Sequence, residues 1–367
     1  MREIVRQVGQ RFMVGFEGLS ASADVRWLIR SLGAGHIILF ARNVDRPEQV
    51  ADLVRELQGV ARDAGHERPL LVAVDQEGGR VARLREPWTL WPPARIVGRA
   101  GSEGLASRAG EAIAAELSAC GIHFDCAPVV DVDSNKANPV IGDRSFGEDP
   151  ELVGRLAAAF IQGLQGGGVA AAAKHFPGLG DTAVDSHLDL PRVEHDRSRL
   201  EAVELRPFRR AIEAGVASVM TAHVLASALD ETLPGTLSPR VVSDVLRKDL
   251  GFRGVVVSDD LEMKAVATRW RPGVAAVLAA KAGCDIVSVC ARAEAQAEAI
   301  EAVIRAVEAG ELASSSMDDA DARIRLLKQR FASPYGDPDP AAARQAAGAS
   351  AHVAVALEIA VRAEIPA

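Results

Sequence analysis

Residues 170–191 read AAAAKHFPGLGDTAVDSHLDLP, and this stretch is the most informative part of the chain. The small apolar residues at its start predict a buried strand, which ends in two basic side chains, Lys174 and His175. A loop rich in Gly and Pro follows and carries an Asp-x-His pair, Asp185 and His187. A rigid strand ending in cations beside such a loop is typical of a site for polar chemistry. The simpler alternative is a capped strand followed by a solvated loop.

Apolar runs of the same kind recur along the chain and predict its fold. Eight of them alternate with segments rich in Ala, Leu, Arg and Glu; they span residues 11–18, 35–40, 70–78, 123–132, 168–176, 217–224, 254–260 and 284–290. Runs that are apolar throughout fit parallel strands covered on both faces. Eight repeats of strand and helix predict a (β/α)₈ barrel, the TIM-barrel fold. A doubly wound sheet is the alternative, but no GxGxxG follows the first strand.

Polar residues gather at the carboxyl ends of the predicted strands. They are Asp75, Glu77, Asp131, Lys174, His175, His223, Asp259 and Asp260. In a barrel all strands end at the same face, and active sites lie there. The fold and the polar stretch therefore indicate one site at that face.

Length and composition fit one such barrel. With 367 residues and 48% hydrophobic content, the chain can fill a single α/β barrel. We predict a catalytic domain over residues 1–331, then a loop and an Ala-rich helical tail over residues 332–367. The net charge of −8 argues against a nucleic-acid partner or an anionic membrane surface. The oligomeric state is not determined by the sequence.

Cysteine usage and the N-terminus indicate the compartment. The four cysteines form no CxxC pair, so buried free thiols are expected rather than disulfides or a zinc site. The N-terminus lacks the apolar core of a signal peptide, and no run approaches 18 apolar residues. We therefore expect a cytoplasmic protein that does not span a membrane.

One segment imitates a calcium loop. Asp131, Asp133 and Asn135 have the spacing of its first ligands, but Lys136 and Gly142 stand where the loop requires Gly and Glu. Walker A and HExxH patterns are absent as well. We assign no metal and no cofactor.

Residues 174–191 resemble the signature of family 3 glycoside hydrolases, in the branch of bacterial β-N-acetylglucosaminidases. That signature is KHFPGxGDTxxDSHxxLP, and the chain matches it throughout, with Leu179 where many members have His. The resemblance implies a (β/α)₈ barrel and a retaining exo-β-N-acetylglucosaminidase. Its substrates would be small N-acetylglucosamine-containing glycans or muropeptides derived from peptidoglycan.

The resemblance also implies which residues perform the chemistry. Glycoside hydrolysis needs an anionic group beneath the anomeric carbon and a proton donor at the leaving oxygen. Asp259 matches the nucleophile of the family's SDxxxM motif, whereas Asp260 is expected to cap the next helix. His187 matches the family's general acid/base, a role that imidazole suits because it exchanges protons near neutral pH. Asp185 would orient the His187 ring.

Five further residues match substrate-binding positions of the family; they are Asp75, Arg83, Arg144, Lys174 and His175. A carboxylate such as that of Asp75 accepts hydrogen bonds from two adjacent sugar hydroxyls. The alternative for Arg83 is a solvated position on a helix. Asp131 and His223 could line the same pocket, although the resemblance assigns them less clearly.

Other functions stay open on the sequence. A phosphorylase would use phosphate in place of water with the same residues, because imidazolium does not repel phosphate as a carboxylate would. A catalytically silent sugar-binding barrel would lack Asp259, His187 or Asp185, and all three are present. An enzyme forming a Schiff base on Lys174 would leave the Asp-x-His pair unexplained.

Overall fold

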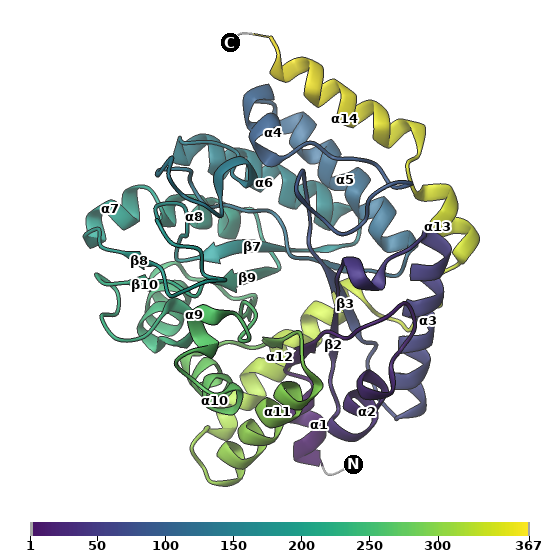
Figure 1. Cartoon of the computed structure of the whole chain (residues 1–367), viewed down its shortest axis with the longest axis vertical. Coiled ribbons are helices and arrows are strands. Elements are labelled where there is room, and N and C mark those ends of the chain that lie inside the picture. Colours follow the sequence, from purple (N-terminus) through teal and green to yellow (C-terminus); the bar gives the residue numbers. More distant parts are fainter. Residues whose placement is uncertain (1–2, 366–367) are drawn as a thin grey trace.

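The computed structural model describes residues 3–365 and has eight parallel strands that form a barrel surrounded by helices (Figure 1). In chain order the barrel strands are β1 (Phe12–Val14), β2 (His36–Leu39), β3 (Leu71–Val74), β6 (Phe124–Asp125), β7 (Ala170–Phe176), β9 (Ser218–Thr221), β11 (Val255–Val257) and β12 (Val287–Val289). Each lies within one of the eight apolar runs, so the predicted (β/α)₈ barrel is confirmed.

The strands pair in one continuous parallel order. That order is β11-β9-β7-β6-β3-β2-β1-β12, and a parallel bridge between Val257 and Ile286 connects the two ends. The carboxyl ends of all eight strands therefore lie at one face of the barrel.

Helices cover the outside of the barrel, and they begin and end where the sequence has the appropriate signals. Those between the strands are α2 (Ala23–Leu32), α3 (Pro47–Asp63), α4 (Ala94–Ala100), α5 (Glu103–Ala119), α6 (Pro150–Gly166), α7 (Arg197–Ala202), α8 (Leu205–Glu213), the π-helix η4 (Arg240–Asp249), α9 (Lys264–Ala267) and α10 (Pro272–Ala282). Helices α1 (Glu3–Gly9), α11 (Ala293–Glu308) and α12 (Ser314–Phe331) flank this repeat. Gly33, Gly215 and Gly283 follow helix ends with φ of 72°, 76° and 113°, as expected for glycines that stop helices before strands.

The core has two layers. The larger fills the space between the helices and the outer faces of the strands. The smaller fills the barrel interior and includes Met13, Phe124, Ala172 and Val257, with Phe331 of α12 packed against it. All four cysteines are buried free thiols, as predicted. Because side chains occupy the interior below the carboxyl ends, the barrel is a packed core rather than a channel.

Short strands and turns lie at the face where the barrel strands end. The hairpin of β4 (Gln76–Gly78) and β5 (Val81–Ala82) follows β3, and β8 (Arg192–Val193) pairs with β10 (Leu225–Ala226). The Gln76 side chain holds the hairpin together, because its Oε1 accepts the backbone N–H groups of Arg83 and Leu84. Three 3₁₀ turns, η1 (Ala41–Asn43), η2 (Gly142–Arg144) and η3 (Gly235–Leu237), complete this face.

The C-terminal tail forms two helices, α13 (Pro340–Ala346) and α14 (Ser350–Ala363). Helix α13 contacts α3, and α14 runs along α4 and α5 (Figure 1). By length and composition, Pro340–Ala363 meets the requirement for crossing a membrane, with a mean hydropathy of 1.3 and 17% of its most apolar window buried. This segment consists of two helices, α13 and α14, that pack against α3, α4 and α5, and length and composition alone are weak evidence for a membrane span.

Candidate active site

A cavity of about 410 Å³ opens at the face where the barrel strands end. The eight residues assigned from the sequence as catalytic or substrate-binding all line it; they are Asp75, Arg83, Arg144, Lys174, His175, Asp185, His187 and Asp259. Met13, Ile38 and Met220 belong to the same lining and to the apolar interior below. A pocket of this volume with polar groups converging above an apolar base is typical of a small-ligand site.

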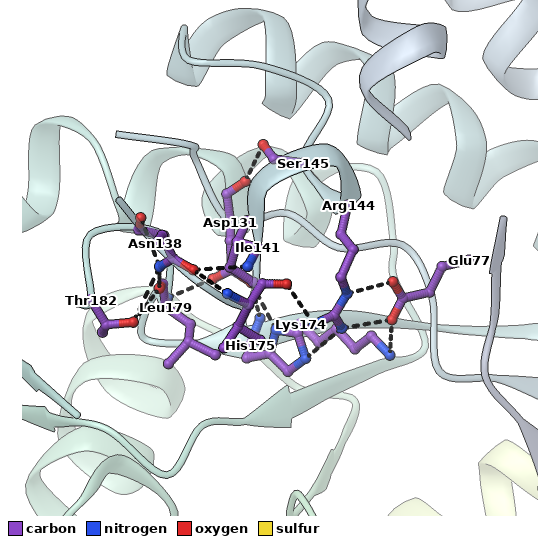
Figure 2. Close-up of polar contacts among 12 residues, drawn as sticks. Glu77, Asp131, Asn138, Ile141, Arg144, Ser145, Lys174, His175, Leu179 and Thr182 are labelled. Carbon is purple, nitrogen blue, oxygen red and sulfur yellow. Dashed lines mark hydrogen bonds and ion pairs between the residues drawn. The ribbon is translucent and has the colours of Figure 1, made fainter. Parts of the chain in front are cut away.

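One wall of the cavity consists of alternating cations and carboxylates. The Lys174 Nζ atom lies 2.9 Å from Asp75 Oδ1 and 2.6 Å from Glu77 Oε1. Arg83 donates to Asp75 over 3.1 Å, and Arg144 donates two hydrogen bonds of 2.8 Å to Glu77. Figure 2 shows Glu77 facing both Arg144 and Lys174. Because Arg and Lys each carry more donors than these bonds use, further donors are available to a ligand.

Burial and the neighbouring cations oppose each other at the two carboxylates. Burial alone would raise the pKa of Asp75, but Lys174 and Arg83 outweigh it and hold that pKa below its ordinary value. Burial would likewise raise the pKa of Glu77, and Lys174 and Arg144 lower it far more. Both groups are therefore anionic at neutral pH. The same pairing raises the pKa of Lys174 despite its burial, so the lysine stays protonated.

Glu77 was not among the predicted site residues. Its side chain is 4% exposed and is the link between Arg144 and Lys174. The only signal in the sequence was its position two residues after Asp75, at the end of a predicted strand. Arg83 follows the β4–β5 hairpin and lines the cavity, so the alternative of a solvated position on a helix is wrong.

Replacing Glu77 by Gln is expected to lower the free energy of unfolding by about 3–5 kcal/mol, because Lys174 and Arg144 stay buried with one carboxylate fewer. Urea denaturation measures this. Folding lowers the pKa of Glu77, so its stabilisation is complete above the ordinary value of 4.5 and is lost as the pH falls. The difference between wild type and variant should therefore shrink on acidification.

Glu301→Gln is the matched control, because Glu301 pairs with Arg305 at 3.6 Å on the exposed face of a helix. Its cost should stay below about 1 kcal/mol. Equal losses in the two variants would contradict the assignment of Glu77 as a buried ionic link.

His175 is held by a carboxylate that the sequence indicated less clearly. Its Nδ1 lies 2.7 Å from Asp131 Oδ2, and its backbone N–H donates to the same oxygen over 3.1 Å. The Arg144 guanidinium lies 3.3 Å from Nε2 on the other side of the ring. Because guanidinium only donates, this geometry places the ring proton on Nδ1, toward Asp131. Asp131 thus supports the cavity wall from behind.

The loop after β7 brings Asp185 and His187 to the cavity mouth. His187 Nδ1 and the His187 backbone N–H both lie 2.8 Å from Asp185 Oδ1. Partial burial would raise the pKa of Asp185, but the hydrogen bonds from His187 hold it below its ordinary value. The His187 side chain is 63% exposed, so its ring is accessible from solution. An ionised carboxylate at Nδ1 orients the ring and leaves Nε2 for proton transfer.

Asp259 lines the same cavity and lies two residues after the end of β11. It accepts the backbone N–H of Asp260 over 2.8 Å. Within residues 3–365, no cationic side chain lies at ion-pair distance from it, whereas Asp75, Glu77 and Asp185 are all paired. Its charge is therefore not neutralised by a partner.

Asp260 has a different environment. Its Oδ1 accepts the backbone N–H groups of Glu262 and Cys290, each over 3.1 Å. Burial raises its pKa to about 7. The expectation that it caps the next helix was wrong: α9 begins after Met263, and Asp260 ties the turn before it to the end of β12. Partial protonation makes Asp260 the weaker candidate for an anionic role.

His223 supports the same segment from below and does not line the cavity. Its Nε2 lies 2.8 Å from the Asp260 carbonyl oxygen, and its Nδ1 lies 2.9 Å from Thr236 Oγ1. Burial lowers its pKa, so the ring is neutral near pH 7. Since a carbonyl only accepts, the proton resides on Nε2.

A barrel with this constellation of carboxylates and an Asp–His pair at the strand ends has the design of a glycoside hydrolase. The chain belongs to glycosyl hydrolase family 3, since residues 3–327 match the model of the family's N-terminal domain. Over 299 residues it is 42% identical to a beta-hexosaminidase from Alkalilimnicola ehrlichii. This match covers 80% of this chain and 83% of that protein.

Two solved structures show the same fold. A family 3 β-N-acetylglucosaminidase from Paenibacillus sp. str. FPU-7 is 46% identical with a TM-score of 0.89, and the match covers 90% of this chain and 63% of that one. NagZ from Neisseria gonorrhoeae, in complex with N-trifluoroacetyl-D-glucosamine, is 32% identical with a TM-score of 0.79; this match covers 96% and 98% of the two chains. This chain thus spans less than two thirds of the Paenibacillus protein and nearly all of the Neisseria one.

Proposed function

We propose that the protein is a retaining exo-β-N-acetylglucosaminidase with Asp259 as its nucleophile. The observation that carries the proposal is the contrast among the cavity carboxylates. Asp75, Glu77 and Asp185 are engaged by cations or by His187, and Asp260 is partly protonated, which leaves Asp259 as the anion available to a developing positive charge. Hydrolysis through an oxocarbenium-like transition state requires such an anion.

The reaction then proceeds in two steps. In the first, an Asp259 oxygen bonds to the anomeric carbon while the bond to the leaving oxygen breaks, and His187 gives its proton to that oxygen. In the second, His187 takes a proton from water, the water oxygen bonds to the anomeric carbon, and the Asp259 carboxylate departs. Two inversions restore the β configuration. Asp185 stabilises the imidazolium form that the first step consumes and the second regenerates.

The cavity wall provides the contacts for a terminal sugar. Asp75 would accept hydrogen bonds from hydroxyls, while Lys174, Arg144 and Arg83 would donate to them. His175 would hold the Arg144 guanidinium in place through Nε2. Because the barrel interior is packed below Met13, the pocket is closed on that side, which suits the terminus of a glycan. Similarity to a beta-hexosaminidase and to a β-N-acetylglucosaminidase supports N-acetylglucosamine as this sugar. Small peptidoglycan-derived glycans or muropeptides are the proposed substrates.

Hydrolysis of 4-nitrophenyl N-acetyl-β-D-glucosaminide, with and without phosphate, tests this function. We expect turnover that phosphate does not change, with free N-acetylglucosamine as the sugar product. Formation of the sugar 1-phosphate would show that the enzyme is a phosphorylase instead. Absence of turnover under both conditions, with the α-anomer and the β-glucoside as comparison substrates, would contradict the proposed substrate.

A further inference from the structure

Asn138 lies in the loop that leads to Arg144, and its side-chain oxygen organises that loop. The Oδ1 atom accepts the backbone N–H of Val140 over 2.9 Å and that of Ile141 over 2.8 Å. The next turn, η2, begins directly after Ile141 and ends with Arg144, whose backbone N–H donates to the Ile141 carbonyl over 2.8 Å. The acceptor side of Asn138 therefore fixes the segment that presents the sugar-binding arginine.

The donor side of the same amide holds the other loop. Its Nδ2 lies 2.8 Å from the Leu179 carbonyl, 3.1 Å from the Gly180 carbonyl and 3.2 Å from Thr182 Oγ1. Figure 2 shows Asn138 beside Leu179 and Thr182, on the far side of His175 from Glu77. These carbonyls belong to the first residues of the loop that carries Asp185 and His187. The Asn138 side chain thus connects the Arg144 loop to the first residues of the loop that carries Asp185 and His187.

The loop that carries Asp185 and His187 has a buried first part, residues 179–182, and a more exposed second part. Leu179 is 3% exposed and Thr182 is fully buried, and the Leu179 N–H is also held by Asp131 Oδ1 over 2.6 Å. Beyond this point Val184 is 41% exposed and Leu188 is 65% exposed. Farther along, the Ser186 carbonyl accepts the Ala265 N–H over 3.1 Å and Asp189 pairs with Arg269 over 2.8 Å. The position of His187 therefore depends on residues 179–182 together with these contacts.

From this geometry we infer that Asn138 is a positioning residue for the general acid. Its contacts are with backbone groups and the Thr182 hydroxyl, and it does not line the cavity. It keeps residues 179–182 in place relative to the Arg144 loop. The inference rests on the proposed function, since it assigns Asn138 a part in delivering the His187 proton. A proton donor displaced by about 1 Å loses on the order of 10²-fold in rate.

Asn138→Asp is the informative variant, because it keeps the acceptor side and replaces the donor side by an anionic oxygen that faces the Leu179 and Gly180 carbonyls. The carboxylate keeps an acceptor for Val140 and Ile141 but loses the N–H groups that hold Leu179, Gly180 and Thr182. We expect kcat/KM for the disaccharide N,N′-diacetylchitobiose, whose leaving group needs protonation, to fall by about 10- to 100-fold. The kcat/KM for a 2,4-dinitrophenyl glycoside, whose dinitrophenolate leaves without being protonated, should change little.

Asn135→Ala is the matched control, since Asn135 reaches the same loop only through longer contacts of 3.3 and 3.5 Å to the Asp181 and Thr182 carbonyls. Its kcat/KM should stay near wild type for both substrates. An Asn138→Asp variant that loses activity equally on both substrates, or on neither, would overturn the inference, as would a control with the same selective loss. If the loss of activity in His187→Ala does not depend on the leaving group, the proposed acid/base role of His187 is wrong. A leaving-group dependence in His187→Ala that is missing in Asn138→Asp would instead contradict only the inference about Asn138.

Discussion

Asp259→Asn should lower kcat/KM for 4-nitrophenyl N-acetyl-β-D-glucosaminide by roughly 10⁴-fold or more, which is the scale of losing a catalytic nucleophile. The amide is nearly the same size as the carboxylate, so the fold and the cation–carboxylate wall should be unchanged. What is lost is both the bond to the anomeric carbon and the negative charge beneath it. Initial rates over a range of substrate concentrations measure the effect.

Two comparisons isolate the nucleophile. Asp260→Asn should cost much less, because burial already holds the Asp260 carboxyl partly protonated. Asp259→Ala leaves space beside the anomeric carbon, and added azide should restore part of the activity and yield the α-glycosyl azide. A large loss in Asp260→Asn with a near-normal Asp259→Asn would exchange the two roles.

His187→Ala is the second large effect and depends on the leaving group. With N,N′-diacetylchitobiose, kcat/KM should fall by about 10²- to 10⁴-fold, because a positioned acid contributes on that scale. With a 2,4-dinitrophenyl glycoside, bond cleavage needs no proton, so kcat/KM should change much less. The later step still needs the base, and the glycosyl-enzyme should accumulate as a burst. Equal losses on both substrates would contradict the acid/base role.

Asp185→Asn tests the pair through the leaving group. The amide has no charge, so it cannot stabilise the imidazolium form of His187 as the carboxylate at 2.8 Å does. The kcat/KM for N,N′-diacetylchitobiose should therefore fall by about 10²- to 10⁴-fold, whereas that for a 2,4-dinitrophenyl glycoside should change much less. Unchanged kcat/KM for the disaccharide would mean that Asp185 does not act on His187.

The barrel could be predicted from the sequence because its strands are buried on both faces. Val255–Val257 and Ala170–Ala173 are apolar throughout, so each run shows its strand without any knowledge of its neighbours. The end of each run then places its polar residues at the common face. That topology explains why all eight predicted site residues line one cavity.

Contacts between residues that are far apart in the sequence could not be predicted in this way. Glu77 meets Arg144 across 67 positions, and Asn138 meets Leu179 across 41. Nothing local to Glu77 or Asn138 predicts these contacts, because they depend on which strands become neighbours. The helical tail could be predicted from its composition, but its packing against α3, α4 and α5 could not, because that packing also depends on which helices become neighbours.

The central claim is a covalent glycosyl–Asp259 intermediate, and trapping it is the most direct test. Reaction with N-acetyl-5-fluoro-β-D-glucosaminyl fluoride should slow release of the sugar and leave it on the enzyme. Trypsin would then yield residues 254–264, GVVVSDDLEMK, carrying one sugar, and fragmentation should place it on Asp259. A sugar on Asp260 or elsewhere, or turnover of the ordinary substrate to the α-anomer with no adduct, would contradict the mechanism.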